Sequence, residues 1–166
     1  LAQERGAPEP GPPRADMLAA GGIHHEGGGA DRAAVLREVV ARLPLPPATD
    51  RAFVEAVLEA REAMGSTGIG DGIAIPHVRN PLLLGAEEPR VMLCLLRHPI
   101  EFDAVDGQPV YALFTVVSST VPAHLKILAR LGFVLHDPGL RARLRDRAPA
   151  ADILARVRAL DAPRGG

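Results

Sequence analysis

Residues 65–77 read Gly-Ser-Thr-Gly-Ile-Gly-Asp-Gly-Ile-Ala-Ile-Pro-His and end on a histidine that can act as a nucleophile. The glycines let the backbone approach a bound anion, so that amide N–H groups can converge on it. Residues 73–75 suit a buried strand, while Pro76 fixes its own φ and keeps the preceding residue extended. We therefore expect His77 at the end of a strand, beside a loop that can bind phosphate.

The candidate phosphate loop is made of small and polar residues, namely Ser66, Thr67, Gly68, Gly70, Asp71 and Gly72. A nucleotide or dinucleotide site is the alternative for such a loop. However, the glycine spacing does not match G-x-G-x-x-G, and no Gly-Lys-Ser or Gly-Lys-Thr follows. The spacing therefore favours a phosphoryl group over a nucleotide.

Two other residues can serve this chemistry. His124 is expected in the first turn of a helix, where free N–H groups and the helix dipole stabilise a phosphate. A capping or exposed histidine explains that position equally well. Arg61 lies one turn before a helix end at Gly65 and can reach the loop. By spacing alone, a solvated arginine, or one paired with Glu59 or Glu62, is the simpler interpretation.

Metal and thiol chemistry are less well supported. His24 and His25 are adjacent on a predicted strand, so they point to opposite faces and do not easily share a metal. Cys94 lies in the apolar run 91–96, which indicates a packed core thiol. With one cysteine, no internal disulfide can form, which is consistent with a reducing compartment.

The composition bounds the class of protein. The chain has 166 residues, 47% apolar and 23% charged, which predicts one folded domain. A net charge of −1 gives no general attraction to nucleic acid or to an anionic membrane.

No apolar run is long enough to span a bilayer and no signal peptide is recognisable, so we expect a cytoplasmic protein without membrane insertion. Because the first residue is Leu1 and not Met, we expect a piece of a longer polypeptide.

The composition along the chain predicts three segments, namely a lead-in, a folded domain and a tail. Prolines without periodicity predict a linker or disordered lead-in over residues 1–15. The domain is expected over residues 16–161, and residues 162–166 are expected to be a disordered tail. Six arginines lie between residues 141 and 158, but no aromatic residue is interleaved to stack on bases. We therefore expect no direct binding of nucleic acid by this domain.

Hydrophobic periodicity predicts helices that alternate with buried strands. A helical turn over residues 17–20 and an edge strand over residues 22–26 come first. Two helices follow, capped by Asp31 and by Thr49 or Asp50. Their apolar faces are expected to comprise Val35, Leu36, Val39, Val40 and Leu43 in the first helix, and Phe53, Val54, Val57, Leu58 and Met64 in the second.

The second half of the chain continues this pattern. Apolar runs over residues 91–96 and 110–117 predict strands buried on both faces. Ser118, Ser119 or Thr120 caps a helix that should bury Leu125, Leu128, Leu131 and Leu135. Asp137 starts a short basic helix that ends near Arg147, and a last helix over residues 149–160 should bury Ile153, Leu154, Val157 and Leu160.

The run from Arg61 to His77 closely resembles the active-site block of enzyme IIA domains of the bacterial phosphotransferase system. The class is the fructose/mannitol type, which includes the nitrogen-regulatory IIA proteins. Residues 99–110 resemble the second block of that family, and residues 123–129 resemble the third. The resemblance extends from about residue 17 to residue 160.

The resemblance implies a role for each candidate residue. His77 matches the phosphorylated histidine, His124 the second active-site histidine and Arg61 the active-site arginine. Asp71 falls where mannitol-type members have a carboxylate. The implied fold is α/β, a central mixed sheet flanked by helices on both faces, which agrees with the alternation above.

The implied activity is phosphoryl transfer. A neutral imidazole of His77 accepts the group from a phosphohistidine carrier protein, and a nucleophile on a downstream partner then removes it. Arg61, His124 and loop amides neutralise the phosphoryl oxygens, without a metal or another cofactor. Family members commonly have glycine after the active histidine, whereas Val78-Arg79-Asn80-Pro81 follows here, so the natural partner is left open.

Four hypotheses follow. The first is a nitrogen-regulatory-like phosphocarrier, whose phosphorylated and free forms bind regulatory target proteins differently. We expect it as a module cut from a protein with an upstream regulatory domain. The second is a sugar-transport IIA component that passes phosphate to a IIB domain. The third is a metallohydrolase built on His77, His124 and Asp71, and the fourth is a non-catalytic sensor of a phosphorylated metabolite.

Overall fold

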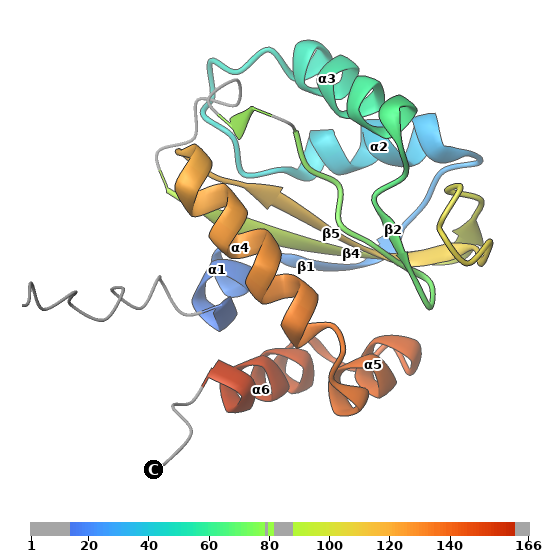
Figure 1. Cartoon of the computed structure of the whole chain (residues 1–166), viewed down its shortest axis with the longest axis vertical. Coiled ribbons are helices and arrows are strands. Elements are labelled where there is room, and N and C mark those ends of the chain that lie inside the picture. The colour runs from blue at the N-terminus through green and yellow to red at the C-terminus, as the bar shows by residue number, and fades with distance from the viewer. Residues whose placement is uncertain (1–13, 79, 82–87, 162–166) are drawn as a thin grey trace, which may run out of the picture.

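The computed structural model describes residues 14–78, 80–81 and 88–161. They form a five-stranded mixed sheet with helices on both faces (Figure 1), which confirms the predicted α/β class. The predicted tail and residues 1–13 of the predicted lead-in lie outside the described residues, whereas residues 14 and 15 begin the first helix. No helix in the described ranges is long and apolar enough to cross a membrane.

The strand order in the sheet is β1-β4-β5-β3-β2. β1 pairs parallel with β4 and β3 pairs parallel with β5, while the β4–β5 and β2–β3 pairs are antiparallel. The strands are β1 (Ile23–Gly27), β2 (Gly68–Gly70), β3 (Ile73–Ala74), β4 (Arg90–Ile100) and β5 (Val110–Val117). β1 is an edge strand, as predicted, whereas β2 forms from residues that the sequence suggested as loop.

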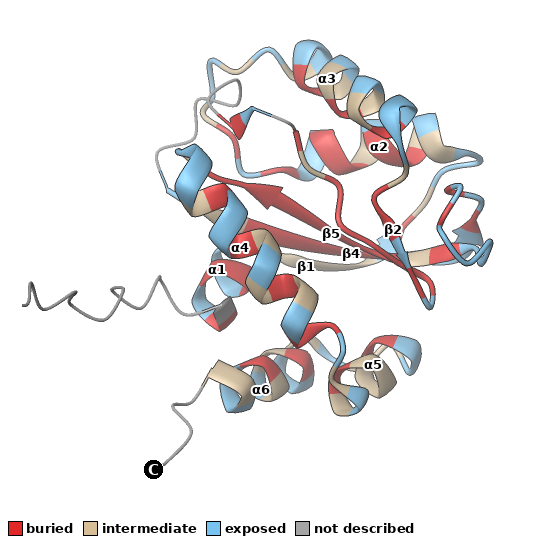
Figure 2. Ribbon diagram, viewed as in Figure 1, coloured by how far each residue is buried: buried red, intermediate tan, exposed pale blue. Residues whose placement is uncertain are grey.

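The two central strands, β4 and β5, are buried along most of their length (Figure 2). Side chains of β4 alternate between two apolar cores, so that Leu93 faces one core and Cys94 the other. The prediction of strands buried on both faces is confirmed. Burial raises the pKa of the Cys94 thiol to about 12, so this cysteine is a packed core residue.

Helices α2 (Arg32–Arg42) and α3 (Arg51–Met64) cover one face of the sheet (Figure 1). The other face is covered by α1 (Arg14–Gly21), α4 (Val121–Val134), α5 (Pro138–Arg145) and α6 (Ala150–Asp161). Four helices are capped as the sequence predicts, because a side-chain oxygen accepts a bond from the N–H three residues later. The caps are Asp31, Asp50, Thr120 and Asp137.

The predicted inner faces of two helices are partly wrong. In α4 the buried residues are His124, Ile127, Leu131 and Val134, while Leu125 is 61% exposed. Phe53 and Met64 of α3 are exposed as well. Both sides of α4 are rich in apolar residues, so leucine spacing alone does not determine which side meets the sheet.

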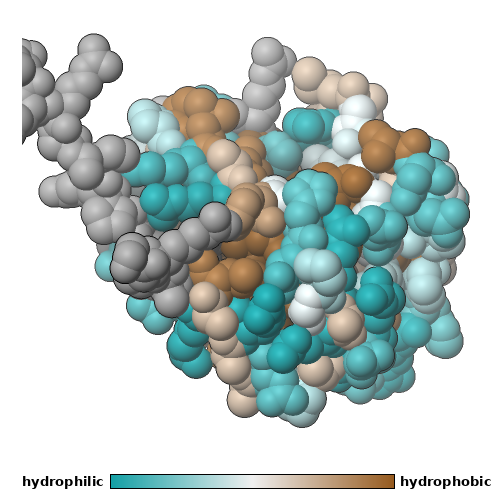
Figure 3. All heavy atoms as spheres, turned by 60° about the horizontal axis from the view of Figure 1, so that its bottom comes forward, coloured by the Kyte–Doolittle hydropathy of each residue, from teal (hydrophilic) through white to brown (hydrophobic). Residues whose placement is uncertain are grey.

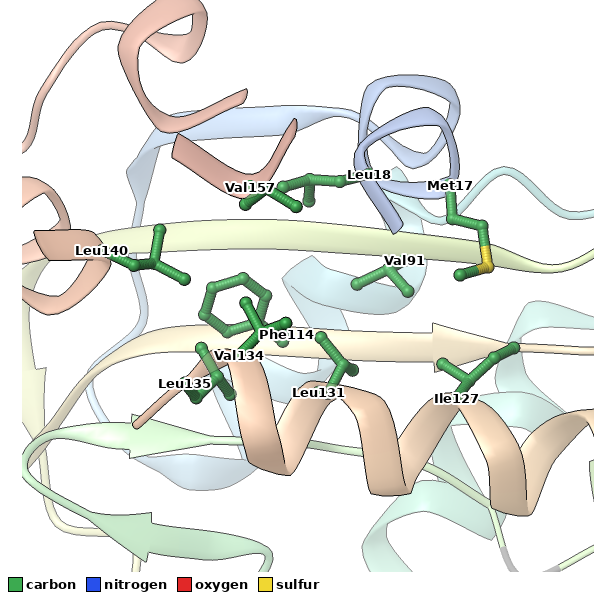
Figure 4. Close-up of a pocket in the computed structure, with 10 residues that line it drawn as sticks. All are labelled: Met17, Leu18, Val91, Phe114, Ile127, Leu131, Val134, Leu135, Leu140 and Val157. Atoms are coloured by element: carbon green, nitrogen blue, oxygen red, sulfur yellow. The ribbon is translucent and has the colours of Figure 1, made fainter. Parts of the chain in front are cut away.

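A small apolar pocket lies between the sheet and the helices α1, α4, α5 and α6 (Figure 4). Its lining is entirely apolar and consists of Met17, Leu18, Val91, Phe114, Ile127, Leu131, Val134, Leu135, Leu140 and Val157. It offers no group for polar chemistry and is part of the apolar core that contains Leu93.

Arginines of α5, of α6 and of the turn between them make contacts within the protein. Figure 3 brings the side of these helices forward, and hydrophilic residues cover much of it. Arg156 binds both carboxylate oxygens of Asp137, and this bond lowers the pKa of Asp137 to about 2. The other contacts are Arg141 with Asp71, Arg143 with the Gly139 carbonyl, and Arg147 with the carbonyls of His25 and Leu96. These bonds give Arg141, Arg143, Arg147 and Arg156 structural roles.

Gly68 lies against the loop that follows β4. A Cβ at this position would lie 2.7 Å from the Cβ of Ala104 and 3.0 Å from its Cα. We expect Gly68→Ala to lower the free energy of unfolding by about 1–3 kcal/mol, because the loop must shift. The control is Gly132→Ala in α4, where an added Cβ meets nothing within 4 Å and should stabilise the helix by up to about 1 kcal/mol. Urea denaturation measures both changes, and an unchanged Gly68→Ala variant would contradict the close contact.

Candidate active site

The parallel pairing of β3 with β5 brings the site together. Ala74 is paired with Leu113, and parallel strands place their carboxyl ends at the same edge of a sheet. The Val116 N–H then donates to the Pro76 carbonyl at 3.1 Å, which continues the pairing to the residue before His77. His77 and the segment that leads into α4 therefore leave the sheet side by side.

His77 is partly buried, and its Nδ1 lies 2.6 Å from the carbonyl oxygen of Ile75. A carbonyl oxygen can only accept a hydrogen bond, so this contact requires the proton on Nδ1. In the neutral ring, Nε2 then has the free lone pair. The backbone thus selects the ring nitrogen that can act as a nucleophile.

The surroundings of His77 favour its neutral form. Burial lowers its pKa below the ordinary value, and the positive charge of Arg61 lowers it further. The Ile75 carbonyl and the charge of Glu62 raise the pKa in part. The balance is a lowered pKa, so the imidazole is neutral at neutral pH.

His124 lies in the first turn of α4 and is only 3% exposed. Its ring centroid is 5.4 Å from that of His77, and the two ring planes are inclined by 57°. Its Nδ1 is 3.1 Å from the Ser118 hydroxyl, while its buried Nε2 has no hydrogen-bond partner among the described residues. Burial and then the charge of His77 lower the pKa of His124, and the Val78 backbone raises it in part. A buried nitrogen of this kind is available to a ligand.

Arg61 lies in the last turn of α3 and donates to the Gly65 carbonyl at 2.6 Å. A cation is favoured at this end of a helix. The bond uses one of the five guanidinium N–H groups, and the arginine is close enough for its charge to lower the pKa of His77. The structure thus brings Arg61, His77 and His124 into one neighbourhood.

Several polar groups of the predicted phosphate loop have partners inside the protein. The Ser66 hydroxyl donates to the Phe102 carbonyl. Three backbone amides donate to side chains, namely Thr67 to Glu62 at 3.0 Å, Gly68 to Ser66 at 3.0 Å and Asp71 to Asp106 at 2.8 Å. These bonds hold the loop in shape, and anion binding by its amides stays a prediction.

The contacts of Asp71 are different from those described for Arg61, His77 and His124. It is at the turn between β2 and β3, has a φ of 55° and pairs with Arg141 of α5. It lines an open hollow of mixed polar and apolar character together with Tyr111 and Arg145. The adjacent Gly72 has a φ of 82°, and a Cβ there would lie 2.5 Å from the Tyr111 ring. The glycines around Asp71 are therefore explained by the turn and by this ring.

Glu62 is a residue that the sequence reasoning missed. It is 3% exposed and accepts bonds from both the amide and the hydroxyl of Thr67. A signal was present, because Val54, Leu58 and Glu62 are spaced four residues apart and form the buried face of α3.

No group of three or more histidine, cysteine, aspartate or glutamate side chains in residues 14–78, 80–81 and 88–161 could hold a metal ion. The adjacent histidines have different partners, because His25 Nε2 contacts the Ala148 carbonyl at 2.7 Å and His24 Nδ1 contacts Arg42 at 3.3 Å. Asp71, the third ligand that a metallohydrolase would need, is paired with Arg141.

The lowered pKa of His77 predicts how it titrates. A neutral imidazole is the form of histidine that can attack, and this form of His77 should persist below pH 6.5, where a free histidine is half protonated, and be lost as the pH falls through the lowered pKa. NMR of the His77 Cε1–H signal between pH 8 and pH 5 measures the midpoint, with the urea-unfolded chain as control. A midpoint at or above that of the unfolded chain would contradict the prediction.

Comparison with known proteins identifies the family. Residues 18–159 match the family model described as phosphoenolpyruvate-dependent sugar phosphotransferase system, EIIA 2. The chain is 39% identical over 113 residues to the nitrogen regulatory protein of Pseudomonas aeruginosa, which covers 67% of this chain and 71% of that protein. It is 32% identical over 96 residues to the PTS system fructose-specific EIIABC component of Bacillus subtilis, covering 57% of this chain and 14% of that protein.

The fold agrees with this assignment. The nitrogen regulatory protein IIA-Ntr from Neisseria meningitidis superposes with a TM-score of 0.74 and 28% identity, covering 86% of this chain and 97% of that structure. IIA mannitol from Escherichia coli has a TM-score of 0.69 at 17% identity over 84% of this chain and 98% of that structure, which supports the fold alone. The chain therefore belongs to the EIIA type 2 family of the phosphoenolpyruvate-dependent sugar phosphotransferase system.

Proposed function

We propose that this domain accepts a phosphoryl group on Nε2 of His77 from a phosphohistidine carrier protein. The observation that carries the proposal is the 2.6 Å contact between His77 Nδ1 and the Ile75 carbonyl, which leaves the Nε2 lone pair for attack. The N–P bond of the carrier breaks as the Nε2–P bond forms, and the bonding electron pair returns to the carrier's imidazole. A nucleophile on a downstream protein reverses the same step.

Arg61 and His124 supply the charge and the hydrogen bond that this transfer needs. The transition state is loose, with negative charge spread over three phosphoryl oxygens, so positioning and neutralisation matter most. When the Ser118 hydroxyl donates to His124 Nδ1, Nε2 of that ring carries its proton toward the site. The guanidinium of Arg61 adds a permanent positive charge beside His77.

The proposed biological role is regulatory and cytoplasmic. The 39% identical relative from Pseudomonas aeruginosa is a nitrogen regulatory protein, which supports a nitrogen-regulatory-like signalling module. Phosphorylation adds nearly two negative charges at one place on the surface, enough to change the binding of a regulatory target protein. The unphosphorylated and phosphorylated domains would then have different partners.

A role in sugar transport is the second candidate. It is favoured by the fructose-specific EIIABC relative and by the solved complex of enzyme IIA mannitol with phosphorylated IIB mannitol from Escherichia coli. In that role, the phosphoryl group on His77 passes to a IIB domain. Transfer to a purified fructose-type or mannitol-type IIB domain separates this candidate from a purely regulatory role.

The test of phosphoryl acceptance is intact mass spectrometry. The domain is incubated with phosphoenolpyruvate, enzyme I and the carrier of either the sugar or the nitrogen branch. We expect the mass of one phosphoryl group to be added, and the adduct to be lost in acid and retained in base, as for a phosphohistidine. A folded domain that gains no adduct from either carrier would overturn the proposal.

A further inference from the structure

Glu62 is a buried carboxylate that the proposed transfer does not use directly. It is on the side of α3 that faces the core, 3% exposed, next to Arg61 in the sequence. Its Oε2 accepts a hydrogen bond from the Thr67 N–H at 3.0 Å, and its Oε1 accepts a hydrogen bond from the Thr67 hydroxyl. A buried charge is costly unless hydrogen bonds satisfy it, and these two bonds do so for Glu62. The presence of a carboxylate at this buried position still requires an explanation.

A continuous series of hydrogen bonds leads from Thr67 to the nucleophile. The Thr67 carbonyl accepts the Ile75 N–H at 3.0 Å. The Ile75 carbonyl in turn contacts His77 Nδ1 at 2.6 Å. The two donors of Thr67 are thus held by Glu62, while its acceptor holds the peptide that orients His77.

We infer that Glu62 is a positioning residue for His77, acting through Thr67 and the Ile75 peptide to keep the proton on Nδ1. Its meaning for catalysis rests on the proposed function above. The carbonyl of Ile75 can select Nδ1 only when the peptide is held in place. The hydrogen-bond partner of a histidine ring fixes its tautomer and orientation, and here that partner is the Ile75 carbonyl.

The carboxylate suits this role better than a neutral side chain. It presents two acceptor oxygens to two donors, and hydrogen bonds to an ionised acceptor are shorter and stronger than neutral ones. Its negative charge also opposes the effect of Arg61 on His77. The phosphorylated ring with a proton on Nδ1 is therefore stabilised when the N–P bond forms.

The test replaces Glu62 by glutamine, which keeps the shape but removes the charge and one acceptor. The first readout is the ¹⁵N chemical shifts of the His77 ring, which distinguish a protonated Nδ1 from a protonated Nε2 without any phosphoryl donor. We expect the parent to be protonated on Nδ1 and Glu62→Gln to be a mixture of tautomers. The second readout is the rate of phosphoryl acceptance, which should fall about tenfold. This is the lower limit of the loss of activity that is usual when a residue outside the direct contacts of a site is replaced.

The matched control is Glu59→Gln, which removes a carboxylate one turn earlier on the same helix. It should keep the parent tautomer and rate. Thr67→Ser retains both donors to Glu62 and should also behave like the parent, whereas Thr67→Val lacks the hydroxyl and should shift the tautomer toward that of Glu62→Gln.

The outcomes are distinct. A folded Glu62→Gln variant with the parent tautomer and the parent rate would overturn the inference. Should that variant fail to fold, the tautomer in Thr67→Val decides in the same way. Should the parent accept no phosphate from either carrier, the proposed function fails, while the ¹⁵N measurement still decides whether Glu62 positions His77.

Discussion

Replacing His77 by glutamine should abolish the phosphoryl adduct and leave the fold intact. Glutamine has a similar size, but the lone pair of its amide nitrogen is delocalised and does not attack phosphorus. Removal of a nucleophile costs on the order of 10⁶ in rate in a well-studied hydrolase, so no adduct should form on the time scale of the parent reaction. The fold should survive because His77 is only partly buried and follows the last paired residue of its segment.

The measurement is intact mass with enzyme I, phosphoenolpyruvate and the carrier, alongside a thermal melt of each variant. The control is His98→Gln, because His98 is an exposed histidine on β4. It should form the adduct as the parent does. An adduct of unchanged rate on His77→Gln would transfer the role of acceptor to another histidine, with His124 the first to examine.

Sheet strands and helix caps could be predicted because their signals are local. The apolar runs of β4 and β5 are buried on both faces, and the capping side chains Asp31 and Asp137 bond as their positions predict. Two residues of β3 are enough to bring His77 to its place, but the register that does so depends on pairing with β5, more than thirty residues later. Sequence spacing contains no information on that pairing.

The orientation of the helices could not be predicted in the same way. In α4, a face through Leu125 and Leu128 and a face through His124 and Ile127 have the same spacing and similar apolar content. The structure buries the second face, and this places His124 next to His77. Leu131 and Leu135 are buried as predicted and Leu128 packs against the core, whereas Leu125 is exposed because His124 occupies the buried position in that turn.

The glycine-rich stretch predicts backbone amides that converge on an anion, whereas three of these amides donate to side chains of the protein. Gly68 belongs to β2 and has no room for a Cβ beside Ala104. Thr67 is held by Glu62, which looked like an ordinary surface glutamate beside Arg61. A charged residue in the four-residue repeat of Val54 and Leu58 was the available sign that α3 carries a buried polar group toward the site.

His124→Ala should slow phosphoryl transfer about 10²-fold in both directions without abolishing it. The acceptor Nε2 of His77 is retained, but the buried Nε2 of His124 no longer donates to the phosphoryl oxygens, and loss of one such donor costs about 10²–10³ in rate. Single-turnover transfer from the phosphorylated carrier and back to the unphosphorylated carrier measures both directions. His124→Gln restores an N–H donor at similar reach and should recover part of the rate, which separates hydrogen bonding from lost packing. Equal rates in the parent and in His124→Ala would contradict a role for His124 as a donor to the phosphoryl oxygens.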